Sequence, residues 1–294
     1  MKKTENATKA TKGNKEATEK RLETMRKNLE ILENQANAIL AKEELTSVDR
    51  MQLLRLLSIN VHGKGSKIED IASIDGTATC DFCAKMRNNA QDNELIICGY
   101  CYAFAESWKE ASFRRHKLNA KILSSVLFSY EELKTVPIPA LLCRINEDGD
   151  IVNAIHAQNV LRIQIMHNYI RFGFWFKNAP AVEQALKAEG ITKREQLPKN
   201  VVFVQSSVLI GFPASPVWFA DCVFTVFPNK ETTENAILNG AFECNGRKCK
   251  DCGFNCYLHE RAENVQYIAE FLRCNAEKRK SIVKAYNERK ANRG

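Results

Sequence analysis

The chain has no run of about 18 consecutive apolar residues, the length that a membrane-spanning helix requires. Its polar first twenty residues also lack the apolar segment of a secretory signal peptide. The sequence contains neither a glycine-rich phosphate-binding loop nor the His-Glu-x-x-His pattern of zinc proteases. We therefore expect a cytoplasmic protein, of a bacterial or a host cell, that has no membrane partner.

Glycine and proline are also scarce, with 13 and 7 residues among 294, while 45% of the residues are hydrophobic. This composition predicts a folded globular protein. The net charge of +8 comes from the two ends, because residues 1–20 carry an excess of three positive charges and residues 277–293 an excess of five. Basic ends either hold phosphates or keep a chain soluble. The expected partner is an unknown small molecule or a nucleic acid.

Three regions are expected along the chain. Residues 1–20 have almost no large apolar side chains, which predicts a disordered basic tail. Residues 21–75 repeat apolar side chains at intervals of three and four, which predicts a helical region divided near Ser47, the expected N-cap of its second helix. These helices either pack on the body or contact a protein partner. Residues 76–294 are expected to form a Cys-rich α/β domain that ends in a basic helix.

Short apolar segments alternate with helical patterns in this domain. The expected strands cover 141–145, 172–176, 201–205 and 222–226, and the expected helices cover 102–127, 154–169, 181–189 and 260–290. Because the strands are almost continuously apolar, both faces of their sheet must be covered. The pattern predicts an α/β fold, either an incomplete (β/α) barrel or a mostly parallel sheet, with a helical N-terminal extension and Cys-rich metal-binding loops.

Eight of the eleven cysteines fall into two groups. The first group contains two Cys-x-x-Cys pairs separated by fourteen residues, a spacing found in zinc ribbons and also compatible with an iron–sulfur cluster: Cys80, Cys83, Cys98 and Cys101. Reducing cytosol disfavours disulfides, so paired cysteines of this kind predict metal ligands. The remaining cysteines, Cys143, Cys222 and Cys274, are expected to be core residues.

The second group packs four cysteines into thirteen residues: Cys244, Cys249, Cys252 and Cys256. Such a compact arrangement is more typical of a ferredoxin-type wrap than of a zinc ribbon. We therefore expect an iron–sulfur cluster, of the [4Fe-4S] type, with zinc as the alternative.

Polar residues follow three successive predicted strands. Asp150 comes after the first strand, Lys177 and Asn178 after the second, and Ser206 after the third. The carboxyl ends of parallel strands meet at one edge, where α/β folds bind their ligands. The pattern predicts a substrate or cosubstrate pocket at this edge, although Asp150 is also compatible with a solvated type I turn. No catalytic residue is identified.

These motifs resemble the phage gene product 88 family in their order over residues 76–258. The resemblance is carried by four segments: 98–104 (Cys-Gly-Tyr-Cys-Tyr-Ala-Phe), 144–150, 174–178 (Phe-Trp-Phe-Lys-Asn) and 249–256 (Cys-Lys-Asp-Cys-Gly-Phe-Asn-Cys). It implies a phage or mobile-element protein whose cysteine motifs hold a cluster.

The segment around Cys101 and the later Gly149-Asp150 are also similar to the layout of radical S-adenosylmethionine enzymes. That resemblance implies that Cys83, Cys98 and Cys101 ligate a [4Fe-4S] cluster and that Asp150 contacts S-adenosylmethionine. The usual short spacing of all three cysteines is absent here. Two hypotheses follow, an iron–sulfur enzyme of unknown substrate and a non-enzymatic zinc module whose basic tails contact nucleic acid or a protein.

Overall fold

The computed structural model describes residues 2–64, 66–76, 95–97, 110–147, 149–244, 248–252, 254, 256–257, 260–262, 264–272, 274 and 276–291. The first cysteine group, Cys80, Cys83, Cys98 and Cys101, lies outside these residues. The second group lies within them.

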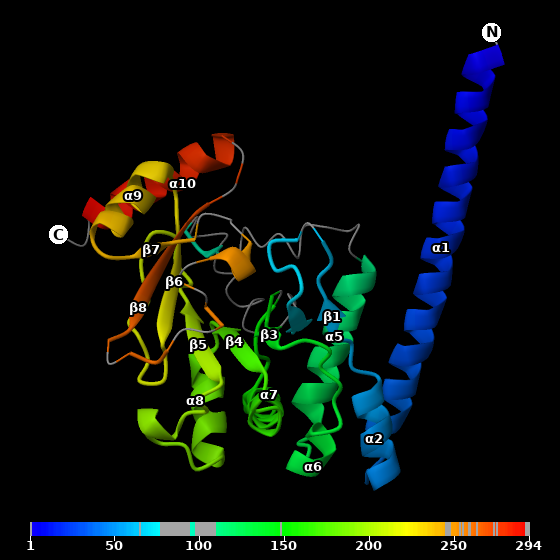
Figure 1. Ribbon diagram of the computed structural model, residues 1–294, viewed down its shortest axis with the longest axis horizontal. Coiled ribbons are helices and arrows are strands. Elements are labelled where there is room, and N and C mark those ends of the chain that lie inside the picture. The colour runs from blue at the N-terminus through cyan, green and yellow to red at the C-terminus, as the bar shows by residue number, and fades with distance from the viewer. Residues whose placement is uncertain are drawn as a thin grey trace.

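An eight-stranded sheet forms the centre of the molecule, in the order β1-β2-β3-β4-β5-β6-β8-β7 (Figure 1). Its strands are β1 (Asn60–Val61), β2 (Ala72–Ile74), β3 (Leu142–Ile145), β4 (Arg171–Phe176), β5 (Val201–Ser206), β6 (Cys222–Phe227), β7 (Phe242–Glu243) and β8 (Gln266–Phe271). Only the β1–β2 pair is antiparallel, and the other six pairs are parallel. The predicted α/β fold and mostly parallel sheet are confirmed. The sheet is open, with β1 and β7 at its edges, and is not closed into a barrel.

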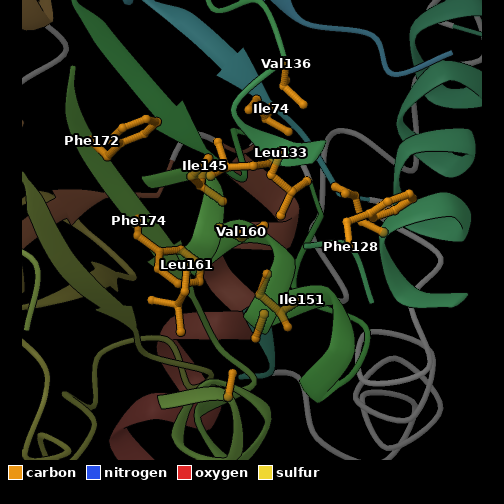
Figure 2. Close-up of a cluster of buried hydrophobic side chains, with 14 of the residues drawn as sticks. Ile74, Phe128, Leu133, Val136, Ile145, Ile151, Val160, Leu161, Phe172 and Phe174 are labelled. Carbon is orange, nitrogen blue, oxygen red and sulfur yellow. The ribbon is translucent and has the colours of Figure 1, made fainter. Parts of the chain in front are cut away.

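Helices cover one face of this sheet, which we call the helix face. They are α5 (Glu110–Ser125), α6 (Tyr130–Leu133), α7 (Ala154–Met166) and α8 (Ala179–Ala188). Alternate strand residues, such as Ile145, Phe172 and Phe174, point into one apolar cluster with Val160 and Leu161 of α7 (Figure 2). All five side chains are at most 1% exposed. This cluster is the main core of the domain, as period-two alternation in strands requires.

The opposite face of the sheet carries the other alternate residues, and we call it the cysteine face. Trp175, Val204, Cys222 and Ile268 lie on it and pack with Cys244 and Cys256 of the second group. The predicted core positions of Cys143 and Cys222 are confirmed, because both side chains are fully buried, Cys143 on the helix face and Cys222 on the cysteine face. Cys274 is half-buried.

Two helices precede the domain, as predicted: α1 (Lys2–Leu40) and α2 (Ser47–Arg55). Figure 1 shows α1 as a long helix on the side of the molecule opposite to α9 and α10. Helix α1 includes residues 2–20, for which the sequence predicts a disordered tail. The Ala, Lys and Glu residues of this part have high helix propensity. The N-cap of α2 is Thr46 instead of Ser47, since Asp49 completes a capping box with Thr46.

The C-terminal region differs from the single helix predicted over 260–290. Residues 266–271 form β8, which pairs with both β6 and β7, and only then does α10 (Ala276–Ala291) begin. Helix α9 (Lys230–Leu238) connects β6 to β7. Two 3₁₀ turns cover Arg194–Gln196 and Cys249–Asp251. Among the helices that the structure describes, none is both long and apolar enough to cross a membrane.

Candidate metal centre

The second cysteine group lies on a segment that crosses the cysteine face of the sheet. At the start of this segment, the Cys244 N–H donates to the Ala269 carbonyl of β8, at 2.8 Å. Further on, the Cys249 N–H donates to the Lys67 carbonyl, also at 2.8 Å, near the opposite edge of the sheet. The backbone of the group is therefore hydrogen-bonded near both edges of the sheet, to β8 near one edge and to the loop between β1 and β2 at the other.

The four thiols of this group lie near enough to influence one another. Burial raises the pKa of the Cys256 thiol to about 12, and the neighbouring Cys244 and Cys249 add to the rise. Burial also raises the pKa of Cys249, with Cys244 and Cys252 contributing in the same direction. Within the described ranges, no three His, Cys, Asp or Glu side chains are placed so that they could hold a metal ion. Metal binding would require these thiols to lose their protons and to move closer together.

Two basic side chains act on three of the four thiols, those of Cys244, Cys249 and Cys256. Lys67 Nζ donates to Cys244 Sγ at 3.2 Å and to Glu270 Oε1 at 3.3 Å. Burial works against the charge on Lys67, yet Glu270 and Cys244 raise its pKa, so the ammonium stays protonated. Arg144, from β3, acts to lower the pKa of both Cys249 and Cys256 against the effect of burial. Both cations favour negative charge on the sulfurs.

Aromatic side chains form the floor beneath the group. The Arg144 guanidinium lies 4.1 Å from the centroid of the Trp175 ring, a cation–π contact. Tyr257, one residue after Cys256, is 1% exposed and packs against Trp175 with ring centroids 5.9 Å apart. Both rings lie over Gly173, where an added Cβ would be 2.6 Å from Trp175 and 3.1 Å from Tyr257. A glycine at this position therefore lets the cysteine segment pack closely on β4.

The predicted strand-end site is assembled only in part. The Asp150 carboxylate is buried and accepts hydrogen bonds from the backbone N–H groups of Lys177 and Asn178, at 3.0–3.1 Å, and from that of Ile151 at 2.8 Å. Burial raises the pKa of Asp150, although Lys177 and the three N–H groups oppose the rise. The hydrogen bonds among the described residues do not join Ser206 to this group. In this structure the Asp150 carboxylate holds the ends of β3 and β4 together.

A polar network that sequence reasoning missed lies at the same edge, around the buried Asp75 that follows β2. Its carboxylate accepts hydrogen bonds from Ser73 Oγ at 2.7 Å, from Asn60 Nδ2 at 3.4 Å and from the Glu147 N–H at 2.7 Å. His116 of α5 places Nε2 3.5 Å from the same carboxylate. The sequence feature that could have predicted this network is the polar–apolar alternation Ser73-Ile74-Asp75. Three residues are too few to identify a strand.

His62 joins this network to Glu147. Its Nε2 lies 3.0 Å from Ser73 Oγ and 2.9 Å from Glu147 Oε2. The hydrogen bond to Glu147 raises the pKa of His62, while burial and Arg144 act to lower it. Burial opposes the charge on Glu147, but His62, Arg144 and His116 together lower its pKa. His62 and Glu147 therefore form a charge-assisted pair.

The described residues before and within the span of the first cysteine group also lie at this edge of the sheet. The Gly76 N–H donates to Asn146 Oδ1 at 3.2 Å, directly after β3. The Ile97 N–H donates to the Val208 carbonyl at 2.9 Å, and the Ile210 N–H donates to the Leu95 carbonyl at 2.8 Å, just beyond β5. Ile97 is the residue before Cys98.

In comparisons with known proteins, no protein-family model, no curated protein and no solved structure matches the chain.

Proposed function

We propose that this chain is a cysteine-ligated metalloprotein in which Cys244, Cys249, Cys252 and Cys256 hold one metal centre. The observation that carries this proposal is the gathering of four half-buried thiols on a single sheet face, where Lys67 and Arg144 act on three of them, Cys244, Cys249 and Cys256. Four thiolates around zinc or around an iron–sulfur core leave a net negative charge. Basic side chains beside the sulfurs offset that charge.

The residues around the group fit such a centre. Lys67 donates a hydrogen bond to the sulfur of Cys244, as residues that surround metal sites commonly do for the metal ligands. Trp175, Phe254 and Tyr257 exclude water from one side, which strengthens electrostatic interactions within the site. When bound, an iron–sulfur cluster would supply one-electron transfer.

Iron–sulfur is the proposed form of the centre because of the compact spacing of the group and its resemblance to the phage gene product 88 pattern. The first group, Cys80 to Cys101, is proposed as a second centre of the same kind. Anaerobic purification tests the metal directly: a brown protein with absorbance at about 400 nm, with iron and sulfide, is expected. A colourless protein with stoichiometric zinc and no sulfide would establish the zinc module in its place.

Loss of one cysteine from each group tests whether the centres are separate. Cys101→Ala and Cys252→Ala are each expected to keep about half of the wild-type metal, because each removes a ligand from only one site. Metal per chain is measured by elemental analysis after anaerobic purification. Cys274→Ala is the matched control and should keep all of the metal. If both ligand variants lose all metal, the two groups share a single centre.

Lys67→Gln tests the contribution of the positive charge beside Cys244. We expect the variant to bind metal about 10- to 100-fold more weakly, the usual range when a metal ligand loses its hydrogen-bond partner. Competition with a chelator of known affinity measures the change. Lys64→Gln, at an exposed position in the same loop, is the matched control and should bind metal as the wild type does. Equal affinity of both variants would show that Lys67 does not support the centre.

A further inference from the structure

The network around Asp75 has the composition of a proton-transfer site. It brings together two imidazoles, two carboxylates and one hydroxyl, from β2, α5 and the segments that follow β1, β2 and β3: His62, His116, Asp75, Glu147 and Ser73. Clusters of this kind at the carboxyl edge of a parallel sheet are typical of functional sites.

The network has a buried part and an accessible part. The side chains of Asp75 and His116 are 0% and 6% exposed, whereas those of His62 and Glu147 are 18% and 26% exposed. Asp75 also holds the Glu147 backbone through its N–H. The buried carboxylate therefore fixes the positions of a pair that can exchange protons with solvent.

Arg144 lies beside both this pair and the cysteine group. It is the cross-strand partner of Ser73, which contacts His62, and the Trp175 ring that it stacks on packs in the same apolar cluster as Cys249. Its guanidinium acts on the pKa of His62 and Glu147 on one side and on that of Cys249 and Cys256 on the other. Its contact with the Trp175 ring keeps the guanidinium on the cysteine face of the sheet. A single charged group thus influences both sites.

We propose that His62 and Glu147, positioned by Asp75, form a proton donor and acceptor site whose protonation is linked through Arg144 to the charge on the cysteine group. The link rests on the proposed metal centre, whereas the proton site itself does not. Binding of a negatively charged centre offsets the field of Arg144 at His62 and favours the imidazolium. By reciprocity, a proton on His62 favours the more negative state of the centre.

Several charged and polar groups face His62 and together set its pKa. Glu147 and Asp75 favour the imidazolium and Arg144 opposes it. Ser73 Oγ contacts the ring nitrogen directly. His116, on α5, reaches the same Asp75 carboxylate and acts on Glu147.

NMR titration of the full-length chain tests the proposal, with the ring signals of His62 assigned by comparison with His62→Gln. In the metal-free protein, Glu147→Gln is expected to lower the pKa of His62 by about one unit, because the hydrogen-bonded anion is lost. An unchanged pKa in this variant would overturn the proton site. This arm does not depend on metal.

Loading with iron and sulfide, or with zinc, tests the link. The pKa of His62 is expected to rise by about half a unit or more in the loaded protein, and the rise should be smaller in Arg144→Gln. His167, at the end of α7, is the internal control and should not shift. A loaded protein in which His62 moves no more than His167 overturns the link. A protein that binds neither metal instead overturns the proposed function.

Discussion

Replacing Asp221 with Ala is expected to lower the free energy of unfolding by about 3–5 kcal/mol. The Asp221 carboxylate is 2% exposed and accepts from Arg194 Nη2 at 2.9 Å and from Arg261 Nε at 2.8 Å. Its second oxygen accepts from the Phe203 N–H at 2.9 Å. The variant would leave two partly buried guanidinium groups without their shared anion. Urea unfolding followed by circular dichroism measures the loss.

An exposed ion pair provides the control for this variant. Glu234 pairs with Lys230 one helical turn away, with both side chains more than half exposed. Because solvent screens such pairs, Glu234→Ala should leave the unfolding midpoint nearly unchanged. A similar, small loss in both variants would mean that Asp221 contributes no more than a surface pair does.

Acid is expected to destabilise the protein through His156 before the carboxylates titrate. His156, in the first turn of α7, is 2% exposed, and burial lowers its pKa to about 4. In the unfolded chain its pKa is about 6.5. Between these values the unfolded chain binds a proton that the folded chain does not. The free energy of unfolding therefore decreases as the pH is lowered from about 6.5 to about 4, by about 3 kcal/mol in total at pH 4.

His156→Gln separates this effect from the titration of other groups. The variant carries no titratable side chain at this position, so its stability should fall less between pH 7 and pH 4, by about the same 3 kcal/mol. Any loss of unfolding free energy that the substitution itself causes is the same at every pH. It therefore does not change the slope of unfolding free energy against pH. If the two curves of unfolding free energy against pH run parallel, His156 is not the acid-sensitive group.

Much of the parallel sheet was predictable because its inner strands are apolar on both sides. Strands β3 to β6 each lie within two residues of their predicted limits. Strand β8 was missed because residues 260–290 contain neither Gly nor Pro, so its pattern merges with that of α10. Strands β1, β2 and β7 have only two or three residues each, too few for a period to show.

The candidate site was predictable only where it depends on local spacing. The four cysteines of the second group stand within thirteen residues, so the sequence alone identifies them. Lys67 meets Cys244 across 177 positions of sequence. Asp150 could contact a substrate or cosubstrate only if its carboxylate were accessible. In the structure three backbone N–H groups donate to that carboxylate, which no sequence pattern indicates. Contacts between distant segments follow from the fold, not from the motif.

The position of β8 has a consequence for synthesis of the protein. This strand is the last in the chain, yet it lies between β6 and β7, and the Cys244 N–H is hydrogen-bonded to it. While residues 266–271 are still inside the ribosome, β7 has no neighbouring strand and Cys244 has no anchor on the sheet. All four cysteines of the second group therefore emerge before the part of their surface that β8 supplies is in place, although Lys67 and β4 to β6 precede them. For the proposed metal centre, loading with metal is therefore expected to follow completion of the chain and not to accompany its translation.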